Sequence, residues 1–439
     1  MFKFWFRCVY VIAFVYFMAW AVSGISTLNI FSAFDPVSQA LGEFDLTDYA
    51  FSNLRPQPTV DERIVIVNIG HLSRREIANQ INIIRQFKPR VIGIDGYFDC
   101  EGGLRDTINC PQLLDTLGNL MLTDAIKEAG NVVLVTKLLQ KTKTANDPNL
   151  IDFYDSIEFS DPSPFSHNAF ANFPTNADYQ EDVKLCRSFI PRMAINGKNE
   201  NAFAVEMAKM YDSTKTNKLF ARGSDEELVN YRGNVELNDI KLKTLHNKDL
   251  GTTNFRLMFY ALDIDQLMNG DFAPELLKDK IVIMGFLGDY FGDPSWEDKY
   301  FTPLNKKVAG RANPDMFGVV VHANIVAMIL NEDYVGTIPD WMQITIATLI
   351  GILTVALFIV VDEKLPIWYD ALSVLIQVAQ LILISGLVVF AFASYTIKLD
   401  LSLSLVVIAL VGPCYDILKP LQTIIETRLT KRTDRVLSQ

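Results

Sequence analysis

Four long apolar runs constrain the fold of this chain more than any other feature. They occupy residues 4–22, 341–361, about 367–392, and 399–411 with a continuation toward 418. An α-helix needs about 20 apolar residues to cross the hydrocarbon core of a bilayer. We therefore expect four transmembrane helices, one N-terminal and three C-terminal. The Gly412-Pro413 pair predicts a kink in the last one.

The first run fits two interpretations. Lys3 and Arg7 beside an apolar core, followed by "AWA" at residues 19–21, resemble a cleavable signal peptide. The core is aromatic and bulky, which favours a retained anchor over residues 1–24. Both interpretations send the segment that follows across the membrane.

Basic residues near the two ends predict the orientation of the chain. Five of them follow the last apolar run: Lys419, Arg428, Lys431, Arg432 and Arg435. Since Lys3 and Arg7 lie at the other end, we expect both termini in the cytoplasm. The prediction is a multi-pass protein of the bacterial inner membrane. It would have a periplasmic domain over residues 25–340, three further spans over 341–415 and a basic tail over 416–439.

The charge of the exported segment limits the choice of partner. Residues 25–340 hold 31 basic and 44 acidic residues, a net charge of −13, which argues against nucleic acid. The chain lacks the patterns GxSxG, HExxH, Walker A and paired Cys–His spacing. We therefore expect no enzyme activity, metal or cofactor. Expected partners are membrane lipid, other membrane or periplasmic proteins, a second copy of the chain, and a small-molecule ligand.

Two cysteines of the exported segment are spaced for a disulfide. Cys100 and Cys110 bracket the polar loop "CEGGLRDTINC", and an exported location permits oxidation. Two free thiols are the alternative interpretation.

The exported segment alternates short apolar strands with helical patterns. Strands are expected at residues 63–70, 90–96, 131–139 and 278–285, and helices at 73–87, 113–130, 201–212 and 316–330. Near-continuous apolar strands separated by helices indicate a parallel sheet covered on both faces. We therefore predict an α/β domain with a doubly wound, mainly parallel sheet. Residues 140–200, rich in Asn, Asp, Pro and Phe, read as a long insertion.

Polar residues follow the carboxyl ends of these strands, where ligands of open α/β sheets bind. They are Asn68, His71, Asp95, Asp99, Thr136, Asp289 and Asp293. A group of carboxylates with one histidine suits a cation or a polyhydroxy ligand. The alternative is that each residue caps a turn or bonds nearby backbone amides.

The order of several short motifs resembles the CHASE2 family of extracytoplasmic sensory domains. The matching stretches are "IVIVNI", "KPRVIGIDGYF", "KDKIVIMGFLGDYFGD" and "TPLN" followed by "MFGVVVHANIVAMIL". The resemblance covers almost the whole chain and includes its layout of one span, an exported domain and three spans. It implies that Thr302, Pro303, Gly318, His322 and Asn324 form the family's structural motif.

Three departures from that family pattern affect the prediction. Asn68 stands where the family often has an acid, and "HLSRREIANQI" replaces a tryptophan–proline–tryptophan stretch. About 25 residues follow the last span, too few for a catalytic output domain. An output is therefore expected on a partner protein.

Aromatic residues crowd the loop between residues 286 and 301. Phe291, Trp296 and Tyr300 are expected to pack beneath the 316–330 helix and to form part of a partner interface. His322 is expected to be a packed residue that hydrogen-bonds this loop, with a ligand role as the alternative.

Two functional hypotheses follow. In the first, the exported domain detects a ligand or the state of the envelope and relays it through the membrane helices, where Gly351 and Gly386 permit close contacts. In the second, the chain is a non-catalytic scaffold subunit of an envelope complex. Four spans with one peripheral acid, Asp370, give no substrate path for a transporter.

Overall fold

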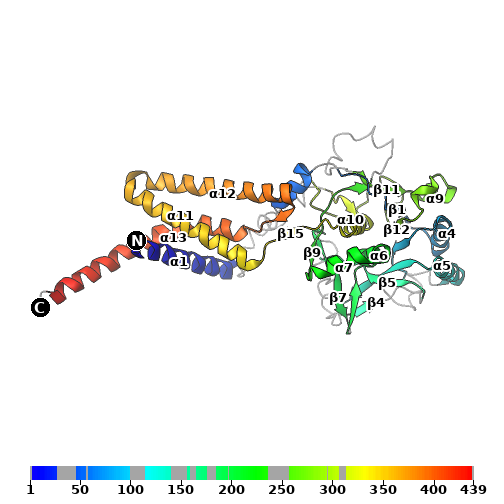
Figure 1. The fold of residues 1–439 in the computed structure, drawn as a ribbon, viewed down its shortest axis with the longest axis horizontal. Helices are drawn as coiled ribbons and strands as arrows, with labels where there is room; N and C mark the ends of the chain where they lie inside the picture. Colours follow the sequence, from blue (N-terminus) through cyan, green and yellow to red (C-terminus); the bar gives the residue numbers. More distant parts are fainter. Residues whose placement is uncertain are drawn as a thin grey trace. The chain divides into compact units, whose positions relative to one another are not determined.

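The computed structural model divides the chain into two compact units, residues 1–42 with 336–439, and residues 43–335. Figure 1 shows the helical first unit and the α/β second unit. The structure describes residues 2–26, 46–55, 58–98, 114–139, 156–158, 165–175, 184–195, 197–235, 257–293, 295–305 and 313–437. Asp99, Cys100 and Cys110 lie outside these residues, so the disulfide stays a prediction.

The second unit is built on a mainly parallel sheet. Its strands lie in the order β10-β11-β1-β12-β2-β3-β4, with β5 also paired to β3. Their bounds are β1 Ile64–Asn68, β2 Val91–Asp95, β3 Val132–Leu139, β4 Ser156–Glu158, β5 His167–Phe170, β10 Asn234–Val235, β11 Leu257–Leu262 and β12 Ile281–Gly285. Of these pairs only β3–β4 is antiparallel. The coarse prediction of a mainly parallel α/β sheet is confirmed.

Helices α4 (Arg74–Ile84) and α5 (Thr116–Ala129) cover one face of this sheet. Ser73 and Glu76 form a capping box that starts α4, and Gly130 in a left-handed conformation ends α5. The apolar sides of both helices share one core with strands β1, β2, β3 and β12. The predicted helices therefore form where the apolar periodicity placed them.

Helices α6 (Phe203–Tyr211) and α10 (Gly318–Asn331) cover the other face. Two glycines of the sheet allow them to approach closely. A Cβ at Gly93 would overlap Met207 and Phe203, and one at Gly285 would lie 2.6 Å from Val319. Helix α10 is buried from Gly318 to Leu330, so its apolar sequence belongs to the interior of the domain.

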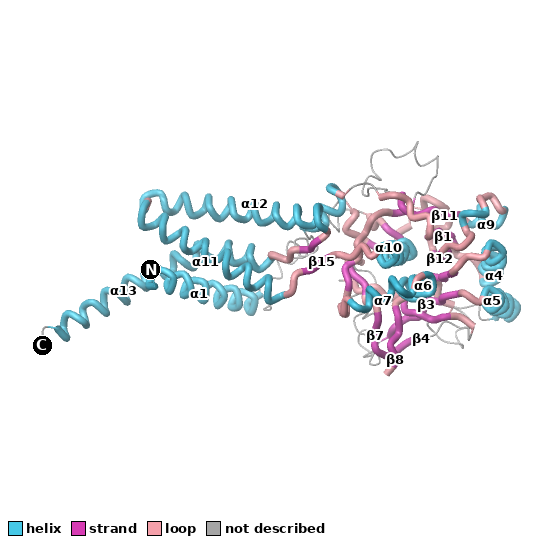
Figure 2. The backbone as a smooth tube through the Cα atoms, viewed as in Figure 1, coloured by secondary structure: helices cyan, strands magenta, loops and turns pink. Residues whose placement is uncertain are grey.

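The first unit contains four helices that are long and apolar enough to cross a membrane (Figure 2). They are α1 Phe2–Ser26, α11 Asp340–Lys364, α12 Tyr369–Tyr395 and α13 Ser402–Leu437. Gly351 lies against Ile12 and Val407, as expected for a helix contact. The same expectation for Gly386 was wrong, because a Cβ there would meet nothing within 4 Å.

Helix α13 continues through Pro413, which lacks the N–H that would bond to Ala409. The side chain of Gln377 on α12 lies beside this break in the backbone hydrogen bonds. Its Nε2 donates to the carbonyl oxygen of Ile408 at 2.6 Å and approaches that of Ala409 at 3.4 Å. An unpaired carbonyl is costly in lipid, so this side chain allows a proline inside a membrane helix.

Ion pairs gather at one end of the first unit. Arg7 lies 3.7 Å from Glu363, and Lys419 lies 2.6 Å from Asp362. The start of α1, the end of α11 and residue 419 of α13 therefore lie at the same end of the helix bundle. This arrangement agrees with the predicted topology, in which these three segments share one side of the membrane.

We expect Gln377→Leu to destabilise the protein in mild detergent by about 1 kcal/mol, because it leaves a carbonyl oxygen unpaired in the helix bundle. The measurement is thermal unfolding of four proteins: wild type, Gln377→Leu, Pro413→Ala and the double variant. In the Pro413→Ala background the backbone N–H returns, so Gln377→Leu should cost much less. An equal loss of stability from Gln377→Leu in the wild-type and Pro413→Ala backgrounds would show that Gln377 does not compensate for the N–H group that Pro413 lacks.

Candidate functional site

Three parallel strands end in one row at the carboxyl edge of the sheet. The register pairs Asn68 of β1 with Gly285 of β12, and Gly285 with Asp95 of β2. A Cβ on Gly285 would lie 3.3 Å from that of Asp95. The row places polar side chains where ligands of parallel α/β sheets bind.

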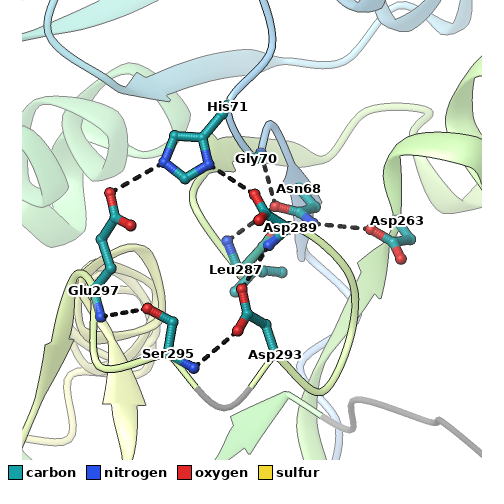
Figure 3. A network of polar contacts seen from close by, with 10 residues as sticks. Asn68, Gly70, His71, Asp263, Leu287, Asp289, Asp293, Ser295 and Glu297 are labelled. Carbon is teal, nitrogen blue, oxygen red and sulfur yellow. Dashed lines mark hydrogen bonds and ion pairs between the residues drawn. The ribbon is translucent and has the colours of Figure 1, made fainter.

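Asn68 is completely buried and uses both ends of its amide (Figure 3). Its Nδ2 donates to Asp263 Oδ1 and to the carbonyl oxygen of Gly288, both at 2.9 Å. Its Oδ1 accepts from the backbone N–H of Gly70 at 3.0 Å and of Leu287 at 2.9 Å. The side chain ties three loops together and has no position left for a ligand, contrary to the expectation from sequence.

His71 bridges two carboxylates of the loop after β12 (Figure 3). Its Nδ1 lies 2.7 Å from Asp289 Oδ1 and its Nε2 3.2 Å from Glu297 Oε1. Hydrogen bonds to these carboxylates raise the pKa of His71. The pairs therefore stabilise the folded loop below pH about 6.5, and this contribution is lost as the pH rises through the raised pKa. It is small, because the three side chains are more than half exposed.

Asp293 shapes the same loop from within. Its carboxylate accepts from the backbone N–H groups of Asp289 at 3.0 Å and Ser295 at 2.8 Å. These bonds lower its pKa. The geometry is that of a turn residue, which was the alternative interpretation of this acid.

A second group of ionisable side chains lies where α10 begins. His322 Nε2 is 4.0 Å from Asp95 Oδ2. Gly318 at the start of α10 donates its N–H to the backbone oxygen of Asp298 at 2.9 Å. A Cβ on Gly318 would lie 3.0 Å from the carboxyl of Asp298, so a larger residue here would require that side chain to shift. We call Asp95, Asp298 and His322 the acidic corner.

The environment of the acidic corner opposes charge. Burial, and then the charge of Asp298, raise the pKa of Asp95 well above its usual range. Burial raises the pKa of Asp298 to about 7, and Lys184 and the N–H of Gly318 oppose that shift. Burial lowers the pKa of His322 to about 3, so its ring is neutral at pH 7. Asp298 is an exposed residue, so screening by solvent weakens the shift of its own pKa.

Aromatic rings enclose His322. Phe173 contacts it with the ring planes tilted by 33° and the centroids 4.4 Å apart, and Phe203 meets it edge-on at 5.0 Å. Tyr300 in turn meets Phe173 edge-on at 5.4 Å. The expected hydrogen bond from His322 to the 285–305 loop is absent among the described contacts, and its Nδ1 is buried there without a partner.

The other residues of the family motif hold the backbone in place. Thr302 donates its N–H and its hydroxyl to Asp315 at 2.8 and 2.6 Å. Pro303 sits in the turn between Thr302 and Asn305, and Asn305 donates to the carbonyl oxygen of Asn313 at 3.0 Å. Asn324 of α10 donates to the carbonyl oxygen of Gly233 at 2.9 Å and accepts from the N–H of Arg232 at 3.1 Å. These contacts fix α10 and its preceding loop.

The aromatic loop divides into buried and exposed parts. Tyr300 and Phe291 are half-buried, whereas Trp296 is 59% exposed. Trp296 meets Phe301 edge-on at 6.5 Å. The interface role of these residues stays a prediction.

Two further observations concern hydrogen bonding and metal binding near this edge of the sheet. Thr136 of β3 is buried, and its hydroxyl has no hydrogen-bond partner in the described part of the chain. No group of three or more His, Cys, Asp or Glu side chains among the described residues is arranged to hold a metal ion. Asp298 was not predicted from the sequence, and only its place in an acidic loop pointed to it.

The α/β unit carries, in order, the motifs on which the resemblance to an extracytoplasmic sensory domain rests. The model of the CHASE2 domain family matches residues 18–361, well over half of the chain. The chain therefore belongs to the CHASE2 family, as the resemblance implied. Searches of curated proteins and of solved structures found no match.

We expect Asn68→Asp to lower the free energy of unfolding by about 2 kcal/mol, because it replaces a buried donor by an acceptor facing Asp263. Asp263→Asn in the same protein returns a donor to the pair and should recover about 1 kcal/mol. Thermal unfolding of both single variants and the double variant measures the coupling. Additive effects would show that the two side chains do not share a hydrogen bond.

We expect Asp298→Asn to stabilise the protein at pH 8 and to leave it nearly unchanged at pH 4. A carboxyl whose folded pKa is raised from 3.8 to about 7 binds more protons when folded, so its contribution to stability falls as pH rises through that interval. Asparagine also tolerates the left-handed backbone of this position, φ 52°. Melting temperatures across pH 4–8 test this. A loss of stability at pH 8 would contradict it.

Proposed function

We propose that this protein is a membrane sensor whose extracytoplasmic domain detects a ligand or the state of the envelope. Its membrane helices relay that signal to a separate partner protein. Membership of a sensory-domain family supports the first part. The acidic corner supports it further, because perturbed ionisable groups at the carboxyl edge of a sheet mark functional sites.

The single observation that carries the relay is the connection of α10 to the membrane unit. Helix α10 supplies Gly318 and His322 to the acidic corner and ends at Asn331. The first helix after it, α11, begins at Asp340 and is apolar enough to cross a membrane. A displacement of α10 on binding would therefore be passed along a short connection to a membrane helix.

Helix α13 provides an exit for the signal. It continues as one helix from the candidate span Ser402–Pro420 to Leu437. At 1.5 Å per residue, the part beyond Pro420 extends about 25 Å. Its basic residues, predicted to face the cytoplasm, offer a contact for an acidic surface of a partner.

Capture of the tagged full-length protein in mild detergent, with mass spectrometry and a native mass, tests this proposal. The matched variant is Lys431→Glu with Arg432→Glu, which reverses charge on the tail and leaves the exported domain unchanged. We expect a stoichiometric partner that the variant binds at least tenfold less. Retention of every partner by the variant would contradict the relay and favour a scaffold held through the exported domain.

A further inference from the structure

The end of helix α10 and the segment that follows it lie along helix α7 (Ser213–Ala221). We call residues 330–335 the connector, because they lead from α10 toward α11. Basic side chains three and four positions apart reach the connector from one face of α7 and from the residue after it; they are Lys215, Lys218 and Arg222. They meet it in sequence order, at the backbone oxygen of Leu330, the carboxylate of Glu332 and the backbone oxygen of Val335. The connector and α7 therefore run side by side in the same direction.

Two arginines outside α7 hold the connector as well. Arg63, which precedes β1, donates through Nη1 to the backbone oxygen of Leu330 at 3.3 Å and through Nη2 to Asn331 Oδ1 at 2.7 Å. Arg232 donates through Nε to Asp333 Oδ2 at 2.8 Å. Cations at the carboxyl end of a helix are also favoured by its dipole. Basic side chains from three parts of the domain therefore converge on six consecutive residues.

Acidic side chains of the domain orient two of these cations. Asp61 accepts a hydrogen bond from Arg63 Nη2 at 2.6 Å. Glu227, whose side chain is 4% exposed, accepts one from Arg222 Nε at 2.7 Å. The body of the domain thus holds both guanidinium groups, so the connector can leave without displacing them.

The contacts of the connector are mostly ionic and reach solvent. The side chains of Lys218 and Glu332, 2.8 Å apart, are 57% and 35% exposed, and those of Arg232 and Asp333 are 28% and 34% exposed. Attraction between partly exposed charges weakens as salt screens it. The bond from Asn230 Nδ2 to the backbone oxygen of Asp333, at 2.9 Å, is neutral and does not depend on salt in this way. Ionic strength therefore acts on most of the side-chain contacts that hold the connector.

The chain passes into the membrane unit directly after the connector. Val335, its last residue, is buried in the second unit, and Gly336 belongs to the first. Strand β15 (Gly336–Thr337) pairs there with β16 (Ile397–Lys398), between helices α12 and α13. A change in the connector would therefore be passed to α11 and also to the segment that leads into α13.

We propose that the connector and the basic side chains around it form an ionic latch. The closed latch fixes the end of α10 to α7, and the open latch leaves the connector free to change its path into α11. The ionic strength of the solution around the domain sets the balance between the two states. This inference deepens the proposed sensor function, because it names ionic strength as a property of the envelope that the protein would detect. Its signalling role rests on the proposed relay, whereas the latch itself is testable without it.

The experiment is hydrogen–deuterium exchange, read by mass spectrometry, of the full-length protein in nanodiscs of phosphatidylcholine, a lipid without net charge. Peptides that cover the connector report its opening. Lys218→Glu should speed their exchange about threefold, because it replaces an attraction to Glu332 by a repulsion. The double variant Lys218→Glu with Glu332→Lys exchanges the two charges and should restore the wild-type rate. Lys278→Glu, at an exposed lysine of the same unit, is the matched control and should leave the connector unchanged.

Salt supplies the second test of the latch. Raising potassium chloride from about 0.05 to about 0.5 M shortens the screening length severalfold and should speed exchange of the connector in the wild type. Sucrose at the same osmolality should not. In Lys218→Glu the same salt should have a smaller effect. Connector exchange that is insensitive to salt would overturn the latch, and so would failure of the double variant to restore the wild-type rate.

The outcome is separable from that of the relay. Exchange rates that follow salt and charge as expected, without any partner that depends on the basic tail, would retain the latch and remove the relay. Unchanged exchange rates together with capture of a tail-dependent partner would remove the latch and leave the sensor proposal in place.

Discussion

The close contact between strand β12 and the start of helix α10 is the constraint on which the functional part of this structure depends. Gly285 lacks a side chain, so Val319 can lie directly on the strand. Gly318, one residue earlier, leaves room for the carboxyl of Asp298. With α10 at this distance, His322 one turn further on reaches the end of β2 and Asp95. A larger residue at Gly285 would meet Val319 and force the helix away from the strand.

Asn68 and Asp95 lie at the same edge of the sheet, on either side of β12, but differ in their hydrogen bonds. Asn68 satisfies its amide completely and holds loops together. Asp95, in the same row of the register, has no such bonds and has a strongly raised pKa. Natural folds satisfy buried polar groups unless function requires otherwise. The amide at the end of β1 is therefore fully hydrogen-bonded, whereas the carboxyl at the end of β2 is not.

The membrane unit shows how polar groups are accommodated among apolar helices. The Gln377 side chain donates to carbonyl oxygens beside Pro413. The Gln380 side chain donates to the Thr354 hydroxyl at 3.1 Å. Because lipid offers no alternative partner, such bonds help to set the register between helices. In the proposed relay, a change in that register would carry the signal to α13.

The sequence by itself determined the elements. Apolar length predicted the four candidate spans, and alternating apolar patterns predicted the helices and strands of a mainly parallel sheet. These signals are local, because they depend on periodicity and on residues with special backbone preferences. The sequence also selected Asp95 and His322, since strand ends and a histidine in an apolar helix are visible without a structure.

Only the tertiary structure decided which of these residues meet. Asp298 comes near enough to affect the pKa of Asp95 because the loop after β12 folds back onto the start of α10. The two residues are about 200 positions apart, and no periodicity encodes this proximity. His71 instead contacts Asp289 and Glu297, and the Asn68 amide is fully hydrogen-bonded to Asp263 and to backbone groups. Burial and hydrogen-bond satisfaction depend on all neighbours at once, so they separate a binding group from a structural one only after the chain has folded.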